Sequence, residues 1–141
     1  MSAAWKLAIV PHYHVMDVWM KVLPLIMKGE KHWKDFYSLN QIRRNLIENT
    51  QQLFVIIEDE TDIIACIISQ IDQFPTKKIA RIAYCGGRRL KPKMMPMVIG
   101  QIESWAKREG AVMIDILGRK GWGRLLPEYT SPGVVFRKEL I

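Results

Sequence analysis

The fold of this chain depends on residues 77–110, KKIARIAYCGGRRLKPKMMPMVIGQIESWAKREG. Residues 77–85 are rich in β-branched and apolar side chains, which predicts a strand. From Met95 onward, apolar residues recur at helical spacing on one face, and Gly110 stands where a helix C-terminal cap is expected. A loop with two glycines and four basic side chains joins the two elements. It is either a solvated basic loop or a seat for an anionic ligand.

The residues before this stretch predict a strand, two helices and a hairpin. Residues 4–10, AWKLAIV, form a short strand that Pro11 ends, and apolar spacing from Val15 predicts a helix with Pro24 as a kink or boundary. Ser38 or Asn40 is placed to cap a second helix, QIRRNLIENT. Strands at 53–57 and 63–71 flank an acidic turn, so they and 77–85 predict three consecutive antiparallel strands.

Beyond Gly110 the pattern predicts a strand at 111–117, a short helix or turn at 120–129 and a closing strand, GVVFRKEL, at 133–140. The order is therefore strand, two helices, three strands, helix, strand, short helix, strand. With 141 residues the chain fits one domain, 1–141, of the α+β or mixed α/β class.

Composition restricts the class of protein further. No uncharged apolar run approaches the ~20 residues needed to cross a bilayer, and the first residues lack the ordered regions of a secretory signal. We therefore expect a cytoplasmic protein with no membrane partner. Cys66 and Cys85 lie in apolar stretches without a CxxC pair, so both are expected to be buried thiols.

Charge is distributed unevenly along the chain. Residues 1–76 carry 7 Lys and Arg against 9 Asp and Glu, whereas residues 77–141 carry 14 against 5. The second half therefore has a net charge of +9 and the first half −2, which sum to +7. Clustered cations attract negatively charged ligands, so nucleic acid, a phosphorylated cofactor or an acidic partner would each fit.

This order of elements, with a basic loop leading into a helix, resembles the GNAT acyltransferase superfamily over essentially the whole chain. The stretches GGRRLKPKMMP and GRKGWGRLLPEY look like small GNAT-type proteins encoded by tailed bacteriophages. Gly110, Tyr129 and Gly133 fall at the family's spacing, with Val134 where an aromatic residue is usual. The resemblance implies a mostly antiparallel sheet with splayed fourth and fifth strands, and transfer of an acetyl group from acetyl-CoA to an amine of a small molecule or protein.

The resemblance also implies which main-chain groups contact the pantetheine arm. The fourth strand presents a freed edge at Ile82, Ala83 and Tyr84 to it. Their role would be through backbone atoms, and the Tyr84 side chain is equally consistent with core packing.

The basic loop is the expected seat for the CoA pyrophosphate. A loop that enters a helix N-terminus offers unpaired N–H groups and the positive end of the helix dipole. Arg88, Arg89, Lys91 and Lys93 surround it with positive charge. The alternative is a solvated basic loop.

Tyr129 matches the family's proton donor to the departing CoA thiolate, although an ordinary surface tyrosine is the alternative. A base is also needed to neutralise the amine. Asp72 and Asp115 are the candidates, Asp115 only if its carboxyl is buried, and an aspartate paired with an arginine is the simpler interpretation. His12 and His14 lack a third ligand nearby, so no metal site is predicted.

Two rival functions remain open. The family's Q/R-x-x-G-x-G/A loop falls on residues 90–95, which contain no glycine. This favours a catalytically inactive GNAT-fold phage protein with a virion-associated or host-interaction role, acting on a phage or host protein partner in the host cytoplasm or the virion. Nucleic-acid binding comes third, since only the basic second half and the interleaved GRKGWGR stretch suggest it.

Overall fold

The computed structural model describes residues 4–88, 91–116 and 122–140. One five-stranded sheet with the order β1-β2-β3-β4-β5 forms its centre. The strands are β1 (Trp5–Val10), β2 (Gln52–Glu58), β3 (Asp62–Gln73), β4 (Lys78–Gly87) and β5 (Ala111–Ile116). The first four pair antiparallel, and β5 pairs parallel to β4. The predicted mixed α+β class with a mostly antiparallel sheet is therefore confirmed.

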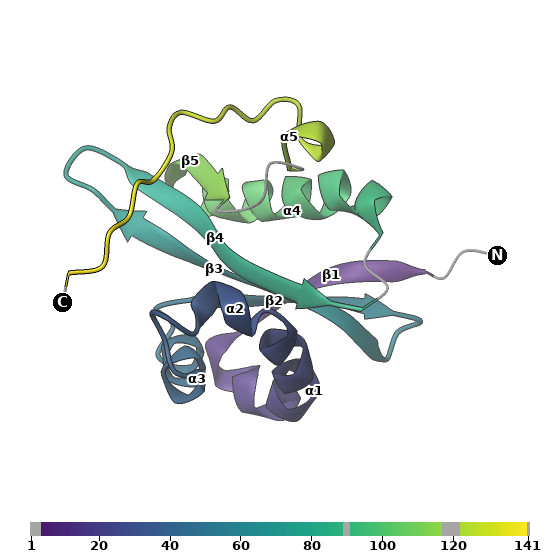
Figure 1. Ribbon diagram of the computed structural model, residues 1–141. Helices are drawn as coiled ribbons and strands as arrows, with labels where there is room; N and C mark the ends of the chain where they lie inside the picture. The colour runs from purple at the N-terminus through teal and green to yellow at the C-terminus, as the bar shows by residue number, and fades with distance from the viewer. Residues whose placement is uncertain (1–3, 89–90, 117–121, 141) are drawn as a thin grey trace.

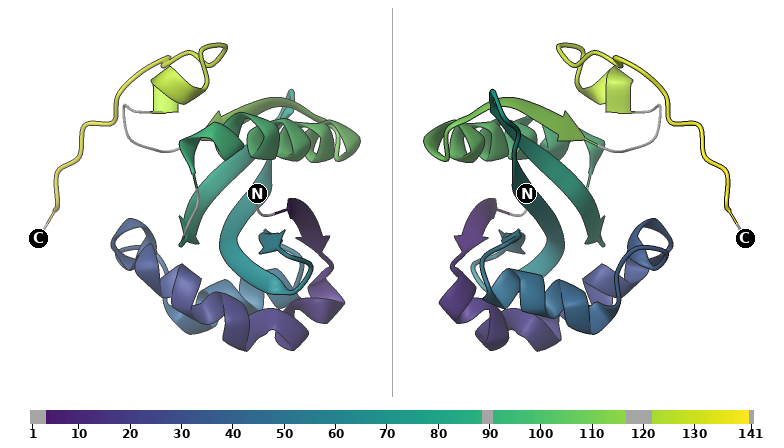
Figure 2. Two further views of the ribbon diagram at one scale, coloured as in Figure 1. Left: turned by 90° about the vertical axis from the view of Figure 1, so that its right-hand side faces the viewer. Right: turned by 90° about the vertical axis from the view of Figure 1, so that its left-hand side faces the viewer.

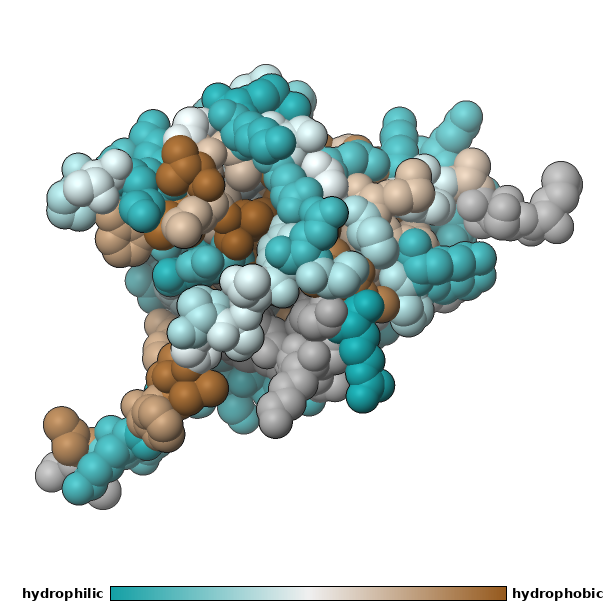
Figure 3. Space-filling view, turned by 90° about the horizontal axis from the view of Figure 1, so that it is seen from above, coloured by the Kyte–Doolittle hydropathy of each residue, from teal (hydrophilic) through white to brown (hydrophobic). Residues whose placement is uncertain are grey.

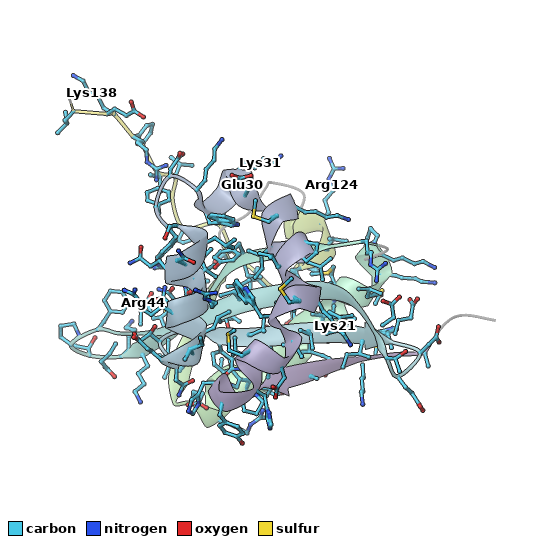
Figure 4. The ribbon with its side chains drawn as sticks, turned by 90° about the horizontal axis from the view of Figure 1, so that it is seen from below. Lys21, Glu30, Lys31, Arg44, Arg124 and Lys138 are labelled. Carbon is cyan, nitrogen blue, oxygen red and sulfur yellow. The ribbon has the colours of Figure 1, made fainter. Side chains whose placement is uncertain are left out.

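Helices cover both faces of this sheet (Figures 1 and 2). Below it lie α1 (Val15–Lys28), α2 (Glu30–Trp33) and α3 (Leu39–Ile47), and above it lies α4 (Met95–Arg108), with α5 (Trp122–Leu125) beyond α4. Short 3₁₀ turns precede α1 (His12–His14) and α4 (Pro92–Met94). Figure 4 shows Lys21, Lys31 and Arg44 on the lower helices, which carry charged side chains on their outer surface.

Each face of the sheet has its own apolar cluster. The upper cluster joins α4 to the sheet, and in it the rings of Phe54 and Trp105 meet edge to face with centroids 5.2 Å apart. The lower cluster joins α1, α2 and α3 to the other face of the sheet. In this cluster the indole N–H of Trp33 donates a hydrogen bond to the carbonyl of Ile26 at 3.0 Å. The sheet is thus packed between two apolar cores, and the burial of their side chains from water drives folding.

Three local predictions are confirmed. Ser38 caps α3, because its Oγ accepts a hydrogen bond from the Gln41 backbone N–H at 3.2 Å. Gly110 follows α4 with φ of 87°, a conformation that favours glycine. The hairpin between β2 and β3 turns at Asp59 and Glu60, which have φ of 52° and 70° as in the tight turns that join antiparallel strands.

Three features differ from the sequence predictions. Helix α1 continues through Pro24 to Lys28, so Pro24 is not a boundary. Residues 30–33 form α2, which the apolar pattern does not show because a single turn is too short for a periodicity. Residues 133–140 form no strand, although their side chains have strand character. Among the described helices none has the length and apolar character needed to span a bilayer.

Candidate active site

A β-bulge interrupts β4 at Ala83. Tyr84 pairs with Ile68 of β3, and Ile82 pairs with the next residue, Ser69, so Ala83 has no partner on β3. A bulge shifts the alternation of side chains by one residue. Ile82 accordingly belongs to the upper cluster and Tyr84 to the lower one, although they are two positions apart.

The pairing of β4 with β5 ends close to the bulge. In the described residues the last pair is Ile82 with Ile116, and β4 continues to Gly87 without a β5 partner. The described pairing of the two strands therefore ends here. Beyond Ile82, the backbone of β4 at Ala83 and Tyr84 has no partner on the β5 side among the described residues, whereas Ile82, which the resemblance also assigned to the free edge, is paired with Ile116.

The two glycines after the splay permit close packing. A Cβ added at Gly86 would overlap the carbonyl oxygen of Leu25 in α1, and one at Gly87 would lie 2.8 Å from the Ala65 Cβ. Neither glycine has positive φ. Gly86 and Gly87 therefore serve the close approach of neighbouring backbones and side chains rather than a positive φ.

The basic loop is only partly free to bind an anion. Arg88 makes an ion pair with Asp62 at the start of β3, so part of its charge is already compensated. Arg89 lies outside the described residues. Lys91 and Lys93 are exposed and stand immediately before α4. In the described part of the loop, Lys91 and Lys93 are therefore the exposed cations next to this helix N-terminus.

The N-terminus of α4 has few free backbone donors. Pro92 and Pro96 have no N–H, the N–H of Met95 donates to the Pro92 carbonyl, and that of Met94 donates to the Lys91 carbonyl. No described side chain caps this end of α4. An anion here would depend chiefly on the lysine side chains and on the helix dipole.

Tyr129 is tied to α4. Its hydroxyl donates a hydrogen bond of 2.5 Å to Oε2 of Glu103, and its ring packs against the upper cluster. Burial raises the pKa of the Tyr129 hydroxyl, and the hydrogen bond and charge of Glu103 raise it further. The hydroxyl thus keeps its proton in the folded protein.

The two candidate carboxylates are placed differently. Asp115 is exposed on β5, so the burial on which its candidacy depended is absent, and its neighbours Ile114 and Ile116 face the upper cluster with Tyr129. Asp72 is engaged through both oxygens, with Arg81 Nη1 at 3.4 Å and Gln70 Nε2 at 2.8 Å. Neither carboxyl is brought next to Tyr129.

Several acetyltransferases of known structure have this arrangement of elements. An aminoglycoside acetyltransferase, meta-AAC0020 from an uncultured soil metagenomic sample, superposes with a TM-score of 0.73, 13% identity and 97% coverage of both chains. The 6'-N-acetyltransferase AAC(6')-Ih from Acinetobacter baumannii gives 0.65, at 15% identity and with 98% of this chain and 99% of that one covered. The chain has the GNAT fold.

A third structure with the GNAT fold is the ribosomal-protein-alanine N-acetyltransferase from Brucella melitensis biovar Abortus 2308, with a TM-score of 0.63, 10% identity and 98% of each chain covered. No protein-family model matches the chain, and the search of curated proteins found no match. The GNAT fold is therefore shown by the three-dimensional arrangement and not by sequence similarity.

A further feature of this GNAT-fold site is the environment of the Tyr84 side chain. Its side chain is buried, and its hydroxyl has no hydrogen-bond partner among the described residues. Burial, followed by the neighbouring Cys66 and Tyr37, raises the pKa of this hydroxyl. The side chain contributes to the lower core, which leaves its main chain to form the free edge.

Sequence reasoning missed Glu103 and the bulge. Glu103 and Tyr129 are 26 positions apart and on different elements, so no local pattern links them. The only sign of the bulge is that Ile82 and Cys85 lie against the upper cluster whereas Tyr84 lies in the lower one. No single alternation of side chains fits all three residues. A single sequence gives no way to distinguish such a shift from an ordinary variation in a strand.

Proposed function

We propose that the protein is an N-acyltransferase that moves an acetyl group from acetyl-CoA to an amine of a small molecule or protein. The observation that carries this proposal is the parting of β4 and β5 after Ile82 and Ile116, beside the N-terminus of α4. It combines an unpaired backbone edge with a lysine-bearing helix start. These two features suit a ligand that has an amide-bearing arm and a phosphorylated end.

The residues present fit such a ligand in their donor chemistry. The free edge of β4 at Ala83 and Tyr84 offers backbone N–H and C=O groups to the amides of pantetheine. Lys91 and Lys93, with the dipole of α4, would hold the pyrophosphate. Acetyl-CoA, when bound, supplies the thioester from which the acetyl group is taken.

Tyr129 is the proposed proton donor to the departing sulfur. Its hydroxyl is protonated at neutral pH, which is the form that a general acid needs, although the raised pKa makes it a weaker acid than an ordinary tyrosine. In this structure the proton is directed at Glu103, so the hydroxyl would turn from Glu103 Oε2 toward the sulfur in order to act. The removal of a proton from the amine is not assigned to Asp115, which is exposed, or to Asp72, which is paired.

The test measures binding and transfer separately. CoA at a hundredfold excess over its dissociation constant should stabilise the fold by about 2.7 kcal/mol, which is readily seen in thermal unfolding. Release of free thiol from acetyl-CoA should then depend on an added amine, tested with an aminoglycoside, a polyamine and an Ala-terminated peptide. Absence of any stabilisation by CoA would contradict the proposal.

A binding protein without catalysis is the second candidate. The loop at 90–95 has no glycine, and the Tyr129 hydroxyl is already engaged by Glu103. Stabilisation by CoA, with no thiol release for any amine, would favour this candidate. Salt-sensitive binding to random DNA without CoA binding would instead favour a nucleic-acid role.

The origin of the chain and its location are further parts of the proposal. The two stretches GGRRLKPKMMP and GRKGWGRLLPEY support a bacteriophage source. A phage protein of this kind would act in the host cytoplasm or be carried in the virion on a phage or host partner. Detection of the protein in purified particles by mass spectrometry would distinguish the two locations.

A further inference from the structure

Helix α1 carries two apolar stripes. The first packs on the sheet and includes the buried Val15, Trp19, Val22 and Ile26. The second has the same spacing, begins one residue later and consists of Met16, Met20, Leu23 and Met27. Because residues three and four apart lie on one face of a helix, each set forms a continuous strip. We call the second set the methionine stripe.

The methionine stripe is largely in solvent. Met16, Met20 and Met27 are 54%, 75% and 39% exposed, and Leu23 is half-buried. Single apolar side chains on a surface are ordinary, whereas a row of them at helical spacing indicates a surface that another molecule covers. Methionine suits such a surface because its flexible side chain adapts to the shape of a partner.

The stripe faces the side of α1 on which α3 lies. The two helices are side by side beneath the sheet. Figure 4 shows Lys21 on the side of α1 away from α3, and Met20 precedes Lys21 by about 100° of helical rotation. Since Val22 is turned to the sheet, the methionine stripe points outward and toward α3.

Helix α3 adds a hollow to this lower surface. The hollow has a volume of about 300 Å³ and is lined by Asn40, Arg43, Arg44, Ile47 and Glu48. Ile47 is 39% exposed, so α3 also presents apolar surface to solvent here. A helix that lies along two adjacent helices packs its side chains between theirs, and the methionine stripe and the hollow are placed for such packing.

Cations flank these apolar side chains on both helices. Lys21 and Lys28 are exposed beside the stripe on α1. Arg44 is exposed on α3, and Arg43 lies next to it with its Nη2 donating to Asn40 Oδ1 at 3.3 Å. A molecule that covers the apolar side chains would therefore meet positive charge along its two sides.

Two carboxylates lie beside the same side chains and offset these cations only in part. Asp17 is hydrogen-bonded to His14 Nδ1 at 2.8 Å, and Glu48 follows the last turn of α3. The four cations therefore exceed the two carboxylates. A second copy of the same surface would bring like charges together, whereas a partner with acidic side chains would be attracted.

We propose that the methionine stripe of α1 and the hollow of α3 dock an amphipathic helix of a partner protein, one whose apolar stripe is flanked by Asp and Glu. Its apolar side chains would pack on Met16 and Met20, and its carboxylates would lie against Lys21 on one side and Arg44 on the other. This is the helix-in-groove mode of recognition. The inference concerns a partner and does not depend on the proposed acyl transfer.

Fluorescence anisotropy with the full-length chain tests this docking. The probe is a labelled peptide of about three heptads of the sequence Leu-Glu-Ala-Leu-Glu-Ala-Glu, and the control peptide has Lys in place of each Glu. We expect the acidic peptide to bind with a Kd of about 1–100 μM and the basic one at least about tenfold more weakly. No binding of the acidic peptide at ~1 mM, or equal binding of the two peptides, would overturn the inference.

Met20→Asp locates the contact on the protein. It should weaken binding of the acidic peptide at least about tenfold, and the fold should persist in thermal unfolding because this side chain is 75% exposed. Met97→Asp is the matched control. Met97 is 63% exposed on α4, on the upper side of the molecule, where Figure 3 shows hydrophilic and apolar side chains mixed. Equal losses in the two variants, or none in Met20→Asp, would contradict the site.

Charge reversal and two further measurements distinguish this partner from other occupants. Lys21→Glu combined with Arg44→Glu should reverse the preference between the two peptides. Light scattering should give the same mass for the native and Met20→Asp chains, and a smaller mass in the variant would mean that a second copy covers this surface. Sedimentation with phosphatidylglycerol vesicles that Met20→Asp abolishes, without peptide binding, would assign the surface to a membrane. Either of the last two results would overturn the inference.

Discussion

Glu103 in α4 accepts a hydrogen bond of 2.5 Å from the hydroxyl of Tyr129, which follows α5. This contact fixes the chain after α5 on the outer side of the upper cluster. It also determines the state of the hydroxyl, because burial and the carboxylate of Glu103 together raise the pKa of Tyr129. The Tyr129 and Glu103 hydrogen bond therefore affects both the position of the chain after α5 and the proposed proton transfer from Tyr129.

Tyr129→Phe separates these two contributions. If the hydroxyl is the general acid, turnover should fall roughly 10²- to 10³-fold while CoA binding is nearly unchanged. Glu103→Gln is the companion variant, because it keeps an acceptor for the hydroxyl and removes the charge. Thiol release with saturating acetyl-CoA measures both. A loss of CoA binding without a loss of turnover in Tyr129→Phe would assign the tyrosine to packing.

Gly86→Ala should strongly destabilise the protein. The added Cβ would overlap the Leu25 carbonyl oxygen, so β4 or α1 has to move, at a cost of about 2–4 kcal/mol. Gly100→Ala is the control: a Cβ there meets no atom within 4 Å, and alanine in a helix interior is favoured by up to about 1 kcal/mol. Urea unfolding should show opposite shifts, and equal shifts would refute the packing argument.

Tyr84→Phe should leave the fold intact or stabilise it by about 1 kcal/mol. The variant removes a buried hydroxyl that has no partner among the described residues, and the desolvation cost of that hydroxyl is removed with it. CoA binding should not change if residue 84 acts through its main chain. A clear drop in CoA affinity would show instead that the hydroxyl contacts the ligand.

The basic residues before α4 should differ in their effect on CoA binding. Lys91→Ala and Lys93→Ala should each weaken binding roughly 3- to 10-fold, because each removes an exposed charge near the helix N-terminus. Arg88→Ala should have a smaller effect, since Arg88 is paired with Asp62. Calorimetric titration with CoA at two salt concentrations checks the ranking. Equal affinities in all three variants and the native protein would make the region a solvated basic loop.

Alkaline pH should destabilise the protein through Cys66. Burial raises the pKa of the Cys66 thiol from 9.0 to about 12. The folded state therefore keeps a proton that the unfolded chain loses near pH 9, so the free energy of unfolding falls as pH rises from about 9 toward 12. Each such proton contributes a slope of about 1.4 kcal/mol per pH unit.

Cys66→Ala tests that assignment. Urea unfolding at a series of pH values from 8 to 10.5 (~2.5 pH units) should give a flatter profile in the variant than in the native chain. Only the slopes are compared, because the smaller side chain also costs some packing energy at every pH. Parallel profiles would exclude Cys66 as the titrating group.

Residues 77–110 illustrate how much of the fold local sequence contains. The strand, the loop and α4 follow from side-chain periodicity, and Gly110 from its place after the helix, because each depends on neighbours within a few positions. The same holds for Ser38 as the α3 cap. The order of these elements was sufficient to indicate the GNAT fold.

The remaining features depend on contacts between distant positions. The Arg88 and Asp62 pair reduces the free charge of the loop and joins that loop to β3, and the pair of Asp72 with Arg81 joins β3 to β4. Strand propensity at 133–140 predicts a closing strand, but propensity does not determine whether a partner edge is within reach. The sequence thus indicates the candidate site residues, but tertiary contacts determine which of their side chains are already engaged in ion pairs.

The bulge at Ala83 determines where β4 can lose a residue. Deletion of Ala83 would restore simple alternation, with Tyr84 directly after Ile82 and still on the lower face, and would leave Gly86 at the Leu25 carbonyl. Deletion of Cys85 with the bulge retained would instead move Gly86 into the preceding position and away from that carbonyl. We therefore expect gene variants of this protein to tolerate the in-frame loss of the codon for Ala83 better than the loss of the codon for Cys85.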